Sequence, residues 1–211
     1  AASSPSGNLS FNVASAKVAS FTAFSYSNFG DLKAGTVANG DYGKFGFRPY
    51  YVETNNGIDT LIRNDDDSKQ INSGYTQYDV MEKILYQQNA KISHLINLQY
   101  STSTDIPRYD RLTDPLNDDS LKYAQWYYGP QNRLLAAYEF KYAGANKLFD
   151  MAHLTASYQA VEESRHDRRY GKTSLNHRTE NVNVIGFNFD FSKTIKHSDI
   201  RYGLESYLND V

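Results

Sequence analysis

The sequence predicts an all-β chain, a segment of an antiparallel transmembrane β-barrel with about eight strands. Three observations lead to this fold class. Apolar and polar residues alternate over segments of about ten residues, aromatic residues are abundant, and the joints between predicted strands are alternately short and long. A barrel strand places one face in lipid and the other in a polar lumen, so all three features are typical of an outer-membrane barrel.

The aromatic content is unusual for a chain of low mean hydropathy. There are 18 Tyr and 11 Phe residues but only one Trp and two Met, and the mean hydropathy is −0.64. Tyrosine is amphipathic, so this richness fits a soluble β-sandwich, a carbohydrate-binding surface, or a barrel with Tyr at both membrane interfaces. The periodicity has to decide among them.

Four segments show the alternation clearly. In the segment 91–100 the even positions are mostly apolar and the odd positions mostly polar, with His94 and Leu95 as exceptions. The pattern recurs in the segments 133–142, 185–191 and 200–209. The side chains expected to face lipid are Ile96, Leu98, Tyr138, Phe140, Phe187, Phe189, Tyr202 and Leu204. Those expected on the opposite, lumen face are Asn97, Gln99, Glu139, Lys141, Asn188 and Glu205.

Eight strands follow from this pattern in chain order. They are Leu9–Ser15, Val18–Leu32, Tyr75–Tyr86, Lys91–Thr104, Asn132–Ala143, Leu148–Arg165, Thr179–Lys193 and Ser198–Asp210. Four joints are tight, whereas the three at 33–74, 105–131 and 166–178 are long and rich in Pro, Asp and Asn. Bacterial outer-membrane barrels have short periplasmic turns and long extracellular loops, and we assign the joints accordingly.

Strand lengths refine this prediction. Val18–Leu32 and Leu148–Arg165 exceed the roughly 9 to 11 residues that cross the hydrocarbon, which favours a large barrel whose wall projects above the membrane. Leu9–Ser15 is only about half as long as Ser198–Asp210, so closing the eight strands would leave peptide groups unpaired in lipid. We therefore expect an open wall of strands and not a closed ring.

Composition excludes several function classes. With 22 basic and 24 acidic residues, the chain lacks the positive field of a nucleic-acid binder. It has no cysteine, no run of eighteen apolar residues, and nothing similar to a serine nucleophile elbow or a phosphate-binding loop. We expect no enzymatic activity, no cofactor and no helical membrane span.

Several local strings resemble the barrel of TonB-dependent outer-membrane receptors in the haem, haemoglobin, transferrin and lactoferrin group. They are Ser27-Asn28-Phe29-Gly30-Asp31-Leu32-Lys33-Ala34-Gly35, Pro107-Arg108-Tyr109-Asp110-Arg111-Leu112, Trp126-Tyr127-Tyr128-Gly129-Pro130-Gln131 with Arg133, and Tyr158-Gln159 with Glu162-Glu163-Ser164-Arg165 and Arg168-Arg169. The strings occur in that family's order. The resemblance implies a plug domain inside twenty-two strands, a location in the bacterial outer membrane, and import of haem or an iron carrier driven through TonB.

The chain departs from the family pattern at both ends. It shows no plug domain and no TonB-contacting segment, and it finishes at Asn209-Asp210-Val211 without the usual terminal aromatic residue. Residues 1–211 are thus expected to be a partial barrel, the early part, with the plug and the remaining strands absent. The expected partners are membrane lipid, the rest of the receptor, TonB through the missing plug, and haem or an iron-carrier ligand. The haem-binding histidine loop of the family is expected farther along.

Candidate binding residues lie in the second and third long loops. Arg108, Asp110, Trp126 and Tyr128 could grip a ligand or pin the loop to the rim through ion pairs and stacking, and we favour pinning. Proline and aromatic content also predict that the segment 105–131 folds as a defined cap with Trp126 buried.

The five histidines include no pair at helical metal spacing, so structural or solvated roles are expected. If one contacts haem, His166 and His177 are the better candidates, because both adjoin the third long loop. The Asp65-Asp66-Asp67 run and Asp114 with Asp118-Asp119 lack an EF-hand pattern and are expected to be solvated charge, not metal ligands. The charges between Glu162 and Arg169 predict a rim or lumen salt-bridge network.

Two other functions remain open on sequence alone. One is a self-contained small outer-membrane barrel acting as an adhesin or porin-like protein, which would need its first and last strands to pair. The other is a soluble β-rich carbohydrate-binding module, which would need Ile185, Phe187 and Phe189 buried in a core.

Overall fold

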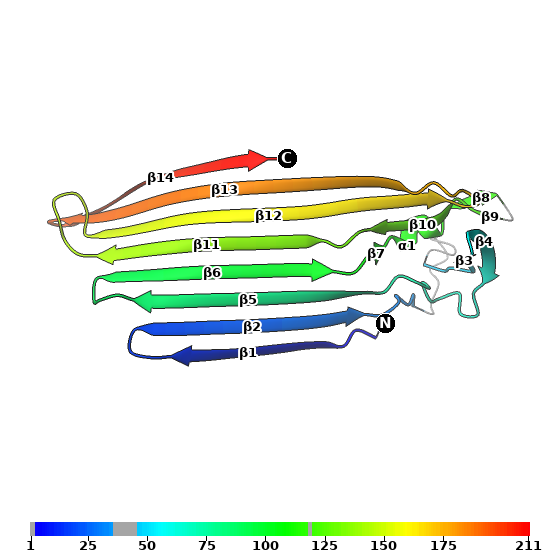
Figure 1. Ribbon diagram of the computed structural model, residues 1–211, viewed down its shortest axis with the longest axis horizontal. Coiled ribbons are helices and arrows are strands. Elements are labelled where there is room, and N and C mark those ends of the chain that lie inside the picture. The colour runs from blue at the N-terminus through cyan, green and yellow to red at the C-terminus, as the bar shows by residue number, and fades with distance from the viewer. Residues whose placement is uncertain (1–2, 36–45, 118–119) are drawn as a thin grey trace.

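Eight long strands form one antiparallel meander in the computed structural model, which describes residues 3–35, 46–117 and 120–211 (Figure 1). Each pairs with the next long strand along the chain. They are β1 (Ser6–Ala14), β2 (Val18–Phe29), β5 (Tyr75–Gln87), β6 (Ile92–Ser103), β11 (Asn132–Ala143), β12 (Met151–Arg169), β13 (Asn176–Ile195) and β14 (Ser198–Asp210). All eight predicted strands are confirmed. The main boundary error is at the ends of β12 and β13, which extend several residues into the predicted third loop.

The turns β1–β2, β5–β6, β11–β12 and β13–β14 lie at one end of the sheet, and the other three connections lie at the opposite end (Figure 1). The β2–β5 and β6–β11 connections are long, as predicted. The prediction of a long third loop is wrong: the β12–β13 connection spans only residues 170–175 and is shorter than the β11–β12 turn, residues 144–150, because β12 and β13 continue into the predicted loop. The β13–β14 turn is a two-residue hairpin in which Lys196 adopts a left-handed φ of 54°.

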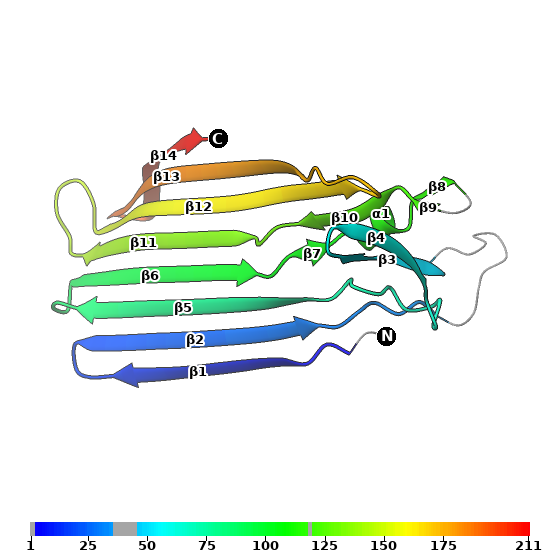
Figure 2. The same ribbon diagram turned by 45° about the vertical axis from the view of Figure 1, so that its right-hand side comes forward.

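The sheet is open between its first and last strands. Within the described ranges, β1 pairs only with β2 and β14 only with β13, and the two strands lie at opposite edges (Figures 1 and 2). The expectation of an open wall is confirmed.

Register sorts the side chains onto two faces. Paired residues in an antiparallel sheet point the same way. The pairs Ile84↔Ile96, Ile96↔Tyr138 and Phe189↔Leu204 therefore extend one apolar face across the sheet. All eight residues predicted to face lipid lie on this apolar face, and all six predicted lumen residues lie on the opposite, polar face.

No second layer of described residues covers the apolar face. Ile96, Leu98 and Phe187 are each 42–43% exposed, and no large side chain among the described residues is fully buried. A soluble sandwich would bury one face of its sheet, whereas this sheet leaves its apolar face uncovered within the chain.

The first and second long loops contain strands and a helix that the sequence pattern does not predict. The first holds the hairpin β3 (Tyr50–Asn55) and β4 (Ile58–Arg63). The second holds β7 (Ile106–Pro107), helix α1 (Tyr109–Leu112), β8 (Pro115–Asn117), β9 (Ser120–Leu121) and β10 (Tyr123–Tyr128). Leu112, Leu121 and Trp126 are buried there, so the predicted cap with a buried Trp126 is confirmed. Across the described residues, no helix has the length and apolar character needed to cross a membrane.

Candidate functional site

Strand β10 provides the platform for the candidate site. It pairs with the end of β12, next to the part of β12 that pairs with β11, and β7 pairs with its other edge. The sequence Tyr123–Tyr128 is aromatic and favours an extended strand. Pro107 is tolerated in β7 because a strand at the edge of a sheet needs no donor on its outer side.

The first cluster lies on the polar-face side of β10. The Arg108 guanidinium lies 4.8 Å from the centre of the Trp126 ring, and its Nε donates to Asp110 Oδ1 at 3.0 Å. Tyr128 packs edge-on against Trp126 with ring centres 5.2 Å apart. The backbone N–H of Arg108 also donates to the Trp126 carbonyl at 2.9 Å. Four predicted site residues are therefore brought together.

The electrostatics of this cluster suit a permanent cation. The hydrogen bond that Arg108 donates to Asp110 raises the pKa of Arg108 above its ordinary value. Trp126 is only 7% exposed, so its ring anchors the loop. Contacts among these four residues occupy most of their polar groups and ring faces, which supports a role in pinning the loop to the rim. Of the four residues in the cluster, only Tyr128 lines a hollow of about 200 Å³ between β7, β10 and β12.

The second cluster lies on the opposite face of the sheet, where β10, β12 and β13 are adjacent. His166 on β12 and His177 on β13 are directly opposite, with their Nδ1 atoms 2.7 Å apart. Tyr127 stacks on the His166 ring at 4.8 Å, and Ser164 Oγ lies 2.8 Å from His166 Nε2. Burial raises the pKa of Tyr127, and the charge of Asp105 adds to that effect. The structure thus separates the six predicted site residues into two groups on two faces.

A buried ion pair fixes the β3–β4 hairpin to this end of the sheet. Arg168 donates two hydrogen bonds to the Asp59 carboxylate, at 2.7 and 2.8 Å, and a third to Thr54 Oγ1 at 2.9 Å. The backbone N–H of Gly171 also donates to Asp59 at 2.8 Å. The Arg168 bonds hold the pKa of Asp59 at about 2, below its ordinary 3.8. The hairpin of the first loop is therefore fixed to the end of β12.

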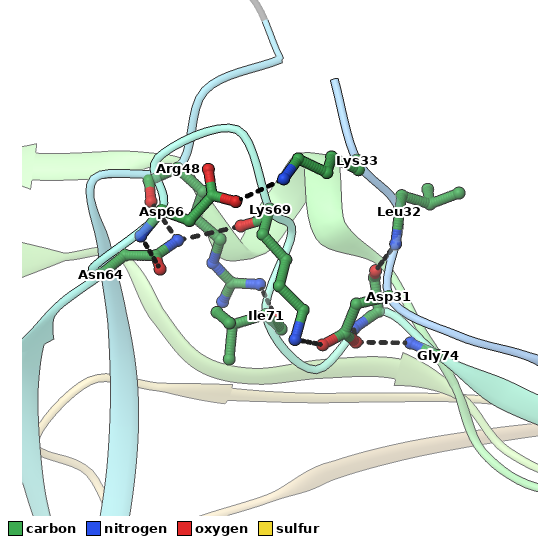
Figure 3. A network of polar contacts seen from close by, with 10 residues as sticks. Asp31, Leu32, Lys33, Arg48, Asn64, Asp66, Lys69, Ile71 and Gly74 are labelled. Atoms are coloured by element: carbon green, nitrogen blue, oxygen red, sulfur yellow. Dashed lines mark hydrogen bonds and ion pairs between the residues drawn. The ribbon is translucent and has the colours of Figure 1, made fainter. Parts of the chain in front are cut away.

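Polar contacts organise the remainder of the first loop (Figure 3). Asn64 donates to the carbonyls of Arg48 and Lys69 at 2.7 and 2.9 Å, and Asp31 accepts from the Gly74 N–H at 3.1 Å. Burial lowers the pKa of Arg48 to about 10, and its guanidinium donates to the Ile71 carbonyl. Hydrogen bonds between buried polar groups, and not an apolar core, hold this loop together.

Most of the described aspartates considered as metal ligands form ion pairs with basic side chains of the same chain. Asp66 and Asp67 pair with Lys33 and Arg63, and Asp114 pairs with Arg111. Asp118 and Asp119 lie outside the described residues. The described part of the chain contains no group of three or more side chains suited to hold a metal ion.

The predicted rim network is present, although most of its partners come from other strands. Arg178 binds Asp167 at 3.1 Å, Arg133 approaches Glu163 at 3.4 Å, and Arg165 approaches Glu180 at 3.8 Å. The most buried member, Arg168, has its partner in the first loop. Sequence reasoning missed Asp59, and the Asn56-Gly57 dipeptide ahead of it was the available signal for the hairpin that carries it.

Comparison with known proteins leaves the family unassigned. No family model, no curated protein and no solved structure matches this chain. The function proposed below therefore rests on the geometry of the sheet and on the resemblance of the loop strings.

Proposed function

We propose that the chain forms part of the wall of a TonB-dependent outer-membrane receptor that imports haem or an iron carrier. The observation that carries the membrane part of this proposal is the uncovered apolar face, which is bordered by aromatic side chains at both ends. The family resemblance of the loop strings supports the receptor part.

At the turn end, aromatic rings form a nearly continuous row across the apolar face. On one side His94 lies 5.8 Å from Tyr86 and 6.0 Å from Tyr138, measured between ring centres. On the other side Phe191 lies 5.3 Å from Tyr202 and the same distance from the turn residue Phe149. Rows of this kind lie at the membrane–water interface in outer-membrane barrels.

A second group of tyrosines lies toward the loop end. Tyr26 and Tyr78 pack with ring centres 5.2 Å apart, and the hydroxyls of Tyr100 and Tyr158 donate to asparagine side chains. Tyr78 and Tyr86 are eight residues apart on β5, or about 27 Å along the strand. A tilt of about 40° reduces this to about 21 Å, close to the roughly 25 Å apolar band of such barrels.

One charged side chain interrupts the band. Glu82 lies between these two tyrosines on the apolar face, but its two carboxylate oxygens accept hydrogen bonds from Ser20 and Thr22. Cross-strand hydroxyls thus satisfy the carboxylate at a position where lipid cannot.

The polar face and the loop cap suit the lumen and mouth of a receptor. A hollow of about 600 Å³ on the polar face is lined by polar side chains, among them Ser25, Gln77, Asp79 and Gln99, together with apolar ones such as Met81 and Leu135. The Arg108–Asp110 ion pair and the packing of Arg108 on Trp126 hold the second loop in place at this rim. The unequal edges β1, with 9 residues, and β14, with 13, disfavour a self-contained small barrel.

Growth on restricted iron sources tests the proposal. Deleting the gene should abolish growth on haem or on one iron carrier while leaving growth on abundant inorganic iron intact, and removing TonB should give the same loss. The chain should also fractionate with the outer membrane. Unchanged growth on haem and on every iron carrier supplied would contradict the import function.

A further inference from the structure

The proposed import function does not rest on the His166–His177 pair. The two residues come from adjacent strands and are directly paired in register. Their Nδ1 atoms are 2.7 Å apart, and their rings meet at 77° with centres separated by 4.8 Å. His166 is half-buried and His177 is exposed, so solvent reaches the pair.

Three neighbours fix the His166 ring. Tyr127 stacks on it within 19° of parallel, and Ser164 Oγ lies 2.8 Å from Nε2, where it can accept the Nε2 hydrogen and leave Nδ1 bare. Gly129 supplies the space for this arrangement, because a Cβ there would lie 2.2 Å from Ser164 Oγ and 2.9 Å from His166 Nε2. A metal-binding histidine is characteristically held in this way through its other nitrogen.

We propose that His166 and His177 form a binding site for a divalent d-block cation, with both Nδ1 atoms as ligands and water in the remaining positions. Metal–nitrogen bonds of about 2.0 to 2.1 Å at angles between 90° and 109° require the two nitrogens to be about 2.9 to 3.4 Å apart. The present separation needs to open by only a few tenths of an ångström. Imidazole ligands suit Zn²⁺, Ni²⁺ and Cu²⁺, and Cu²⁺ binds most tightly among them.

The location suits a site open to the exterior. His166 is eight residues beyond Tyr158 on β12, about 27 Å farther along the strand than the loop-end tyrosines. The site therefore lies on the projecting part of the wall, beyond the apolar band.

Titration of the refolded full chain with Cu²⁺ and, separately, Zn²⁺ tests this proposal. His177→Ala should lower the affinity for each ion at least about tenfold, and Ser164→Ala should lower it less. The matched control is His197→Ala, which removes an exposed histidine from the β13–β14 turn and should leave the affinity unchanged.

Electron paramagnetic resonance of the Cu²⁺-loaded wild-type chain gives a second readout that does not depend on any variant folding. The expected spectrum shows two coordinated imidazole nitrogens. A spectrum with one nitrogen, an unchanged affinity in His177→Ala, or an equal loss in His197→Ala would overturn the assignment. None of these outcomes depends on whether the chain imports haem or an iron carrier.

Discussion

The Asp59–Arg168 ion pair should control whether the β3–β4 hairpin stays docked on the sheet. The Asp59 side chain is 1% exposed and the Arg168 side chain 8% exposed. Replacing one partner of a buried pair leaves an uncompensated charge and costs about 3 to 5 kcal/mol. Asp59→Ala should therefore weaken docking by this amount, because Arg168 loses a bidentate partner that no other side chain replaces.

Hydrogen exchange of the hairpin amides measures this effect locally. A loss of about 3 kcal/mol corresponds to an increase in exchange of more than a hundredfold. Asp67→Ala is the matched control, since it removes the partner of the exposed Arg63 and should have a much smaller effect. Adding Arg168→Met to Asp59→Ala should restore part of the protection. Equal exchange in the Asp59 and Asp67 variants would refute the reasoning.

The same pair sets a pH window for hairpin docking. The pKa of Asp59 is about 2 in the folded chain, against an ordinary 3.8. The free energy that the ionised carboxylate contributes to hairpin docking is therefore fully present above about pH 4. That contribution, about 2 kcal/mol, is lost as the pH falls from 4 to 2. Exchange in Asp59→Asn should not show this acid dependence, whereas acid-independent exchange in the wild-type chain would contradict the assignment.

Three further outcomes are expected. Trp126→Ala should cost about 3 to 5 kcal/mol of cap stability, measured by exchange of the loop amides, because the ring is buried. Gly129→Ala should displace the Ser164 side chain, visible as loss of the wild-type histidine signals by nuclear magnetic resonance, because the added Cβ would overlap Ser164 Oγ. Glu82→Leu should make folding into lipid more favourable, measured by refolding titration, and a less favourable folding free energy would count against a lipid-facing position.

The eight long strands could be predicted because one residue pattern governs each of them. Alternation gives both the strand and its faces, so the opposite faces of Phe187 and Asn188 follow from the sequence. Tight turns then leave adjacent antiparallel pairing as the simplest connection. The buried Trp126 could be expected for a similar reason, because a large ring is costly to leave in water.

The loop structure was harder to predict because its determinants are not local. The β3–β4 hairpin had a local signal, since Asn56 and Gly57 have φ values of 51° and 79° that this dipeptide tolerates. The Asp59–Arg168 pair joins residues 109 positions apart. The His166–His177 pair is a cross-strand pair, so a search for helical metal spacing could not find it.

The two faces of β13 provide the most direct test of the central claim, that the apolar face contacts lipid. Phe187 lies on the apolar face and the adjacent Asn188 on the polar face. In refolding titrations into lipid bilayers, Phe187→Arg should cost about 2 to 4 kcal/mol, and Asn188→Arg should cost much less. Equal costs for the two substitutions would contradict the account.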